Sequence, residues 1–174
     1  MLKCRSFGDL IMICKIRELK KSSSSLDSVF GEIAFLRAEY PDFYNWFYNK
    51  VVPGLENGSR KIFIAQTPFS FGKIDGILIL KDSLDEKKIC TLYVNKDARY
   101  NGFGRMFMNI AFNELNTDKP LITIASNKIK LFQILLDDYK FELCEQNPDF
   151  YSKGMSEYSV NGKLYLPKKL SYYA

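Results

Sequence analysis

Histidine is absent from the 174-residue sequence. Its absence excludes Ser-His-Asp and Cys-His nucleophilic schemes and removes the commonest general base. Any catalysis must therefore use carboxylates, tyrosines, lysines, backbone groups or water. The four cysteines lie at positions 4, 14, 90 and 144, without the CxxC spacing of zinc sites. Because both histidine and paired cysteines are lacking, we expect no metal site.

The sequence also lacks any apolar run near the roughly 20 residues that span a bilayer. A secretory signal core is interrupted at Gly8-Asp9. We therefore expect a cytoplasmic protein without a membrane partner. The length and the hydrophobic fraction of 47% fit one globular domain. The net charge of +5 favours anionic ligands such as a nucleotide cofactor, RNA or an acidic protein surface, and it fits a solvated basic surface equally well.

Hydrophobic periodicity and turn residues predict strands and helices along most of the chain. Strands are expected at 12–19, 61–66, 74–80, 89–94, 121–125, 141–144 and 156–160, and helices at 26–34, 42–52, 102–115 and 128–138. The three strands between 61 and 94 are joined by turns, which predicts an antiparallel meander. A helix separates the strand ending at Val94 from the one starting at Leu121, so these two should be parallel neighbours in a right-handed crossover.

The expected helix at 42–52 is rich in aromatic residues: Phe43, Tyr44, Trp46, Phe47 and Tyr48. Most of them fall on one broad helical face, which favours packing in the core. The alternative is that they line a substrate pocket, with the exposed tyrosines contacting an acceptor.

The segment from Ile89 to Arg105 runs from an apolar strand through a polar loop into the start of a helix. Glycines at 102 and 104 would let backbone N–H groups approach a pyrophosphate, and the positive helix N-terminus would favour the anion. Arg99 and Arg105 could add charge-assisted hydrogen bonds. The loop is not a P-loop, because no Gly-Lys-Ser/Thr follows, and it lacks the third glycine and downstream acid of a dinucleotide fingerprint.

The stretch Arg99-Tyr100-Asn101-Gly102-Phe103-Gly104 resembles the central Arg/Gln-x-x-Gly-x-Gly/Ala motif of the GNAT N-acetyltransferase family. The order of elements from 12 to 160 is similar to that family as well. The resemblance implies an α/β (α+β) fold: a mixed, mostly antiparallel sheet of six to seven strands with flanking helices and a V-shaped split between the central parallel strands. Residues 1–11 would then be an N-terminal extension and residues 161–174 a C-terminal tail.

The same resemblance implies that acetyl-CoA, or another acyl-CoA, is the co-substrate. Its pantetheine would pair with backbone groups of Leu92 and Val94, and one backbone N–H of that strand would stabilise the oxyanion. The expected cofactor-binding residues are Leu92, Tyr93, Val94, Arg99, Tyr100, Asn101, Gly102, Phe103, Gly104, Arg105 and Asn127.

An amine acceptor must lose a proton before it attacks the thioester. Glu157 and Asp75 are candidate bases by type, although a solvated charge on a strand face is the favoured interpretation of both. In the family, a tyrosine four residues before the glycine of a Leu-Gly-Phe-like corner often protonates the leaving thiolate, and this corner appears here as Tyr139-Lys140-Phe141. The corresponding position here is Leu136, so Tyr139 or a later tyrosine, Tyr151 or Tyr158, would have to replace it.

The sequence therefore predicts an acyl-CoA-dependent N-acyltransferase that moves an acetyl group to a primary amine by direct attack. The acceptor could be a small molecule, a protein or charged tRNA, and GNAT-like toxins that act on charged tRNA are a known subgroup. A GNAT-like module that binds CoA without turnover is the rival interpretation. A strand edge or the basic tail could support a homodimer.

Overall fold

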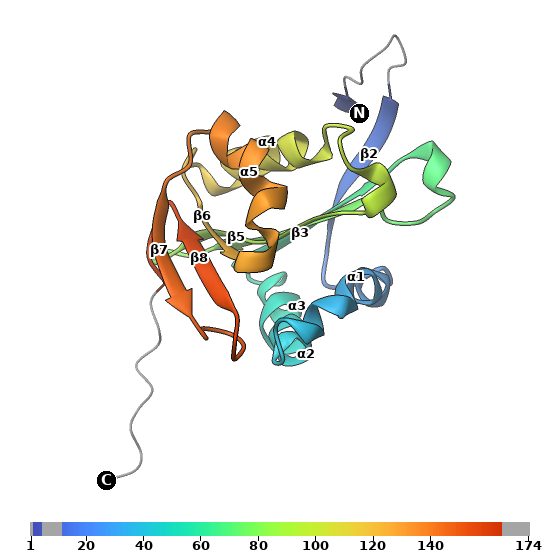
Figure 1. Cartoon of the computed structure of the whole chain (residues 1–174). Helices are drawn as coiled ribbons and strands as arrows, with labels where there is room; N and C mark the ends of the chain where they lie inside the picture. Colours follow the sequence, from blue (N-terminus) through green and yellow to red (C-terminus); the bar gives the residue numbers. More distant parts are fainter. Residues whose placement is uncertain (1, 5–11, 165–174) are drawn as a thin grey trace.

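The computed structural model describes residues 2–4 and 12–164, which form one sheet with helices on both faces (Figure 1). The sheet has eight strands in the order β1-β2-β3-β4-β5-β6-β8-β7. Their bounds are β1 Leu2–Cys4, β2 Met12–Leu19, β3 Arg60–Gln66, β4 Gly76–Asp82, β5 Lys87–Val94, β6 Leu121–Ala125, β7 Leu143–Pro148 and β8 Ser156–Val160. Neighbouring strands are antiparallel except β5 and β6. The predicted mixed sheet is thus confirmed.

Strands β2 to β8 are the seven strands that the sequence predicts, and β1 adds an eighth at the edge. Within the proposed N-terminal extension, β1 pairs with β2, with Leu2 opposite Cys14. The rest of that extension and residues 165–174 of the proposed tail lie outside the described residues. Strand β7 begins at Leu143, not at Phe141 as predicted. The reason is that the Phe141 N–H donates to the Leu136 carbonyl and completes the end of the preceding helix.

The helices divide between the two faces of the sheet (Figure 1). One face carries α1 Leu26–Ile33, the 3₁₀ turn η1 Ala34–Ala38, α2 Phe43–Trp46, the π-turn η2 Phe47–Val51 and α3 Val52–Gly54. The other carries α4 Phe103–Leu115 and α5 Ile129–Asp138. The predicted helix at 42–52 is therefore real but contains a wider turn. This turn ends two residues before Pro53, which has no N–H to donate within the helix.

Each face of the sheet has its own apolar core, because successive side chains of a strand point to opposite faces. Under α4, Phe103, Phe107 and Leu115 pack against Leu78 and Leu80. On the opposite face, α1 to α3 pack against the alternate residues of the same strands; the buried members there include Val29, Ile33, Phe47, Ile62, Ile77 and Ile79. The central strands are thus covered on both sides.

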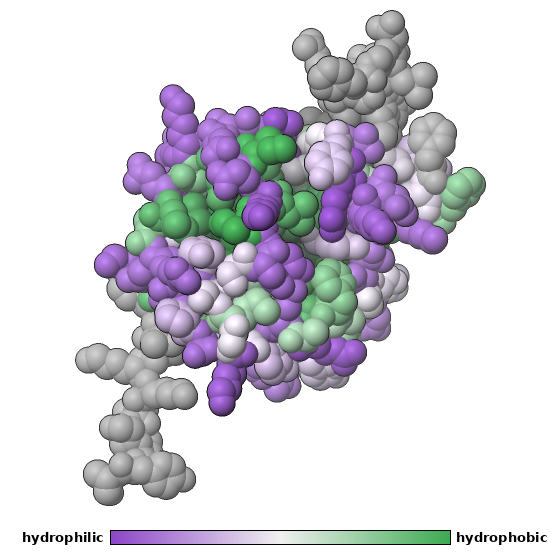
Figure 2. Space-filling model, viewed as in Figure 1, coloured by the Kyte–Doolittle hydropathy of each residue, from purple (hydrophilic) through white to green (hydrophobic). Residues whose placement is uncertain are grey.

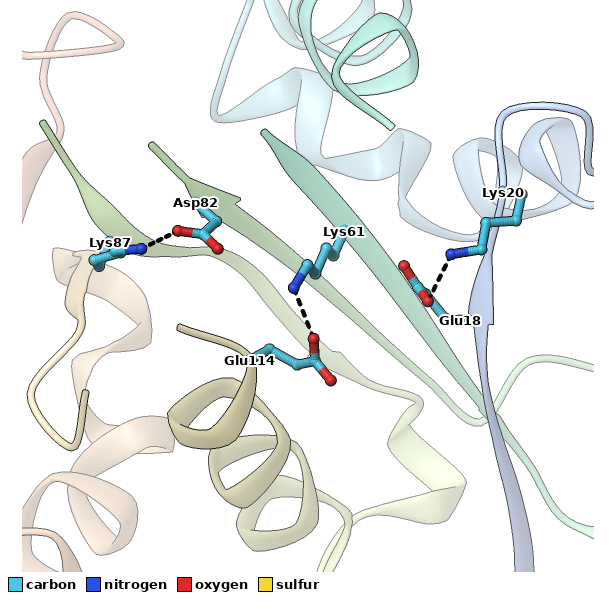
Figure 3. Close-up of polar contacts among 6 residues, drawn as sticks. All are labelled: Glu18, Lys20, Lys61, Asp82, Lys87 and Glu114. Atoms are coloured by element: carbon cyan, nitrogen blue, oxygen red, sulfur yellow. Dashed lines mark hydrogen bonds and ion pairs between the residues drawn. The ribbon is translucent and has the colours of Figure 1, made fainter. Parts of the chain in front are cut away.

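Ion pairs tie strand ends to each other and to α4 at the surface (Figure 3). Lys61 of β3 pairs with Glu114 of α4 at 2.8 Å, and Lys87 pairs with Asp82 across the β4–β5 turn. Lys20 pairs with Glu18 at 2.8 Å. These side chains are partly exposed, so each pair contributes at most about 1 kcal/mol. The stability of the fold comes from the two apolar cores.

The parallel strands β5 and β6 separate soon after they meet. Their pairing consists of Lys88 opposite Leu121 and Ile89 opposite Ile122. On the other side of β5, Thr91 lies opposite Ile79 while Ile89 lies opposite Leu80, so Cys90 is the extra residue of a β-bulge. A bulge bends its strand and increases the local twist. It therefore turns β5 away from β6 and produces the V-shaped split that the resemblance to the GNAT family implies.

Candidate active site

A cavity of about 870 Å³ occupies the split and reaches both faces of the sheet. From the α4 and α5 side its walls include Gly102, Phe103, Gly104, Leu131, Phe132 and Leu135. From the α1 to α3 side they include Phe35, Leu36, Tyr40, Phe43 and Trp46. Strand residues between these two sets include Thr91, Leu92, Thr123 and Ala125. A molecule bound on one face can therefore meet a molecule bound on the other.

The free edge of β5 faces this cavity. The Asn95 N–H donates to the Asp75 carbonyl at 2.8 Å, on the β4 side of the strand. Backbone groups alternate in direction along a strand, so those of Val94 and Leu92 point to the opposite side, where β6 has separated. The Arg99 Nε donates to the Val94 carbonyl oxygen at 3.2 Å, in agreement with this direction. Leu92 and Val94 thus have the geometry expected for pairing with an extended ligand.

Tyr93, between them, also lines the cavity, but its hydroxyl donates to Glu32 at 2.8 Å. Burial and this hydrogen bond raise the pKa of Tyr93 to about 12. Its side chain therefore anchors β5 to α1 in the neutral form.

The two glycines at the start of α4 have different roles. Gly102 is the N-cap of α4 with φ of 84°, a left-handed conformation that side chains disfavour. It leaves the first N–H groups of α4 at the cavity wall, as a phosphate site requires. A Cβ on Gly104 would lie 3.2 Å from the Leu135 side chain, so this glycine allows α4 to approach α5. Of these two glycines, only Gly102 sets the backbone conformation of the loop before α4.

The predicted polar residues of the loop are not all at the cavity. Arg99 and Arg105 line it, and Arg105 also pairs with Asp138, with Nε 2.9 Å from Oδ2. Tyr100 lines it too but is 90% exposed, and it has φ of 64°. Asn101 lies outside the lining.

Asn127 also lies outside the lining. Its Nδ2 is 3.3 Å from the Glu39 carboxylate. Lys128 holds the same carboxylate at 2.9 Å. The structure therefore gives Asn127 a contact across the mouth of the split rather than a position on the cavity wall.

Glu157 of β8 is buried, with only 3% of its surface exposed, so the favoured interpretation of a solvated strand-face charge is wrong for this residue. The Tyr40 hydroxyl lies 3.4 Å from Glu157 Oε1 and donates to it. Burial raises the pKa of Glu157 to about 7, against the opposing effect of hydrogen bonds with Thr123 and Tyr40. A carboxyl group that titrates near neutral pH can accept a proton under physiological conditions.

Tyr40 was not a candidate on sequence grounds, yet it connects Glu157 to the cavity. It is 117 residues away from Glu157 in the chain. Its position before Pro41, between two helices, carries no local signal of a site. The ring of Tyr151, from the β7–β8 loop, packs edge-on against it with centroids 5.3 Å apart. Burial and Glu157 raise the pKa of Tyr151 to about 12, and this tyrosine also lines the cavity.

The other candidate acids and bases lie elsewhere. The Tyr139 hydroxyl is 3.4 Å from the Arg105 carbonyl oxygen, its ring packs against Phe112, and it is outside the cavity lining. Tyr158 is also outside the lining, and strand alternation turns it to the face opposite Glu157. Asp75 accepts the Thr67 N–H at 2.5 Å and holds the loop after β3.

Two negative findings apply to the described part of the chain. No group of three or more His, Cys, Asp and Glu side chains is arranged to hold a metal ion there. Nor does that part contain a helix that is both long and apolar enough to cross a membrane.

Comparison by sequence finds no match: no protein-family profile and no curated protein matches this chain. Comparison by structure finds clear likenesses. A structure from Desulfovibrio desulfuricans assigned to the GNAT family of acetyltransferases has a TM-score of 0.62 at 11% identity, over 85% of this chain and 97% of that one. A dodecameric spermidine N-acetyltransferase from Vibrio cholerae has a TM-score of 0.57 at 14% identity, over 84% and 91%.

Nourseothricin acetyltransferase has a TM-score of 0.53 at 16% identity, and the match covers 60% of this chain and 65% of that one. The chain thus belongs to the class of α/β proteins with a mixed sheet that is split between its parallel strands. More particularly, it has the fold of the GNAT acetyltransferases.

Proposed function

We propose that the chain is an acyl-CoA-dependent N-acyltransferase that transfers an acetyl group from acetyl-CoA to a primary amine. One observation carries the proposal: the split between β5 and β6 opens beside a left-handed glycine at the N-terminus of α4. This arrangement combines an extended strand edge with an anion site. Two structural neighbours, nourseothricin acetyltransferase and a spermidine N-acetyltransferase, support it, because they share the fold of this chain.

In this proposal the donor lies on the α4 and α5 side. Its pyrophosphate accepts hydrogen bonds from the first N–H groups of α4, with Arg99 nearby. Its pantetheine extends along β5 and pairs with backbone groups of Leu92 and Val94. Apolar side chains of α5, such as Phe132 and Leu135, cover it. The thioester then reaches the opening between the strands.

The amine approaches from the α1 to α3 side and attacks the thioester carbonyl carbon. Before the attack, the ammonium gives its proton to the Tyr40 oxygen while Tyr40 gives its own proton to Glu157. The C–N bond then forms, a backbone N–H of β5 stabilises the oxyanion, and the C–S bond breaks. The Tyr151 hydroxyl donates its proton to the leaving thiolate and regains one from water. Tyr151, which lines the cavity, replaces the tyrosine that is absent at position 136.

Calorimetric titration with acetyl-CoA tests the donor site. We expect micromolar binding to the unmodified chain and its loss in Gly102→Glu, because the new carboxylate adds bulk and negative charge where the pyrophosphate would lie. The matched control is Gly58→Glu. Gly58 also has positive φ, 76°, has no atom within 4 Å of a Cβ added there, and lies outside the cavity lining. This variant carries the same backbone strain and charge, and it should bind normally.

If the unmodified chain does not bind acetyl-CoA, the transferase proposal is wrong. If it binds acetyl-CoA but neither hydrolyses it nor acetylates any of a panel of amines above background, the chain is a CoA-binding module without turnover. Equal loss of binding in both glycine variants would show that backbone strain, rather than a block of the pyrophosphate site, is responsible.

A further inference from the structure

The half of the cavity on the α1 to α3 side is walled by aromatic rings in mutual contact. The Phe43 and Trp46 rings are 5.3 Å apart between centroids with an angle of 30° between their planes. Tyr40 packs edge-on against Tyr151 at 5.3 Å. Phe35 and Tyr93 are 5.8 Å apart and complete the wall. A planar apolar group can pack against such surfaces face-on or edge-on.

Apolar side chains from both sides of the split are also exposed where the cavity opens. Phe35, Leu131 and Ile134 line the cavity and are 51%, 45% and 57% exposed. Figure 2 shows apolar surface gathered over α5, which carries two of them. Phe35 therefore extends the apolar surface of the acceptor half outward, whereas Leu131 and Ile134 lie on the α5 side, where the donor is proposed to bind.

The charges of the lining do not favour an acceptor with several positive charges. Two carboxylates line the cavity, and both have partners: Glu39 pairs with Lys128 at 2.9 Å, and Asp42 accepts from Asn45 at 2.9 Å. Lys50, Lys88 and Lys128 line the same cavity. With three lysines against two carboxylates, a polyamine would be repelled rather than held.

We propose that the acceptor is a primary monoamine that carries an aromatic ring. Its ring would pack against Phe43 and Trp46, and its single ammonium group would lie near Tyr40, which hydrogen-bonds Glu157. This inference rests on the proposed function. It adds the chemical class of the acceptor, which the fold alone leaves open.

The test compares three amines at saturating acetyl-CoA: 2-phenylethylamine, n-butylamine and spermidine. We expect kcat/KM to be at least about tenfold higher for 2-phenylethylamine than for either of the others, because only its ring fills the aromatic half. Trp46→Ala should lower kcat/KM for 2-phenylethylamine about tenfold and leave the affinity for acetyl-CoA unchanged. Trp46→Leu, which keeps an apolar side chain but removes the aromatic ring, should also lower the preference for the aromatic amine.

Tyr44→Ala is the matched control, because Tyr44 lies on the same helix, is 53% exposed and is outside the cavity lining. This variant should retain the preference. The acceptor proposal is overturned if spermidine or butylamine is used as well as 2-phenylethylamine, or if both Trp46 variants lower turnover of all amines equally. Either result leaves the transferase function intact, whereas absence of acetyl-CoA binding or of all turnover overturns both proposals.

Discussion

Replacing Glu157 by glutamine is expected to lower kcat about 100-fold, at the lower end of what a general base contributes. Glutamine has nearly the same shape and can still contact Tyr40, but it cannot accept the proton that Tyr40 passes on. In the unmodified chain, activity should rise with pH through about 7, where Glu157 loses its proton. The pH profile of kcat measured at saturating amine should lose this step in Glu157→Gln.

The same substitution should raise stability at high pH, which a purely structural role of an ionised Glu157 would not predict. The pKa of Glu157 is raised from 4.5 to about 7 in the folded chain, so the folded state holds a proton that the unfolded state has released. Stability of the unmodified chain therefore falls as pH rises from about 4.5 through 7. This difference in pKa corresponds to on the order of 3 kcal/mol, which glutamine avoids.

Thermal unfolding at pH 5 and pH 8.5 measures this effect. Glu157→Gln should unfold at a temperature several degrees higher than the unmodified chain at pH 8.5, with a much smaller difference at pH 5. Glu145→Gln is the control, because Glu145 lies on the neighbouring strand β7 with a side chain that is 37% exposed. If Glu157→Gln is instead less stable than the unmodified chain at pH 8.5, Glu157 is charged and held by partners in the folded chain. The proton-relay proposal would then be abandoned.

Gly76→Ala is expected to destabilise the chain by about 1 to 3 kcal/mol, the usual cost of overpacking a filled core. A Cβ at this position would lie 2.6 Å from the Phe107 ring and 3.1 Å from the Tyr93 carbonyl oxygen. Gly76 lies at the start of β4, opposite Val94 of β5, so the glycine lets α4 approach β4 beside the strand that faces the cavity. Urea denaturation should show a lower midpoint with an unchanged slope.

Gly31→Ala provides the opposite control for this prediction. Gly31 lies inside α1, and nothing lies within 4 Å of a Cβ added there. Alanine should therefore stabilise the chain by about 0.5 to 1 kcal/mol through helix propensity and lower chain entropy. If both alanine variants change stability equally, the contact between Gly76 and Phe107 does not limit packing, and the proposed close approach of α4 is wrong.

The apolar periodicity of the chain was sufficient to predict most of the fold. Strands such as Leu121–Ala125 and Ser156–Val160 have the bounds that the sequence predicts, because alternation and flanking turns are local signals. The helix between β5 and β6 was enough to predict that these two strands are parallel. The loop at Gly102 was also predictable, since a strand, a glycine loop and a helix start follow one another in sequence.

The acid–base part of the candidate site depends on tertiary contacts. A glutamate in an alternating strand has the same local pattern whether its face is solvated or covered, and Glu157 is buried beside Tyr40, which comes from the other end of the chain. Tyr151 and Tyr139 are equally plausible by residue type, yet only Tyr151 of these two lines the cavity. The sequence by itself determined strands β2 to β8 and the glycine loop through local patterns, but not the edge strand β1. Burial, and with it the pKa of Glu157, was decided by segments that meet only when the chain folds, because desolvation depends on everything packed around a group.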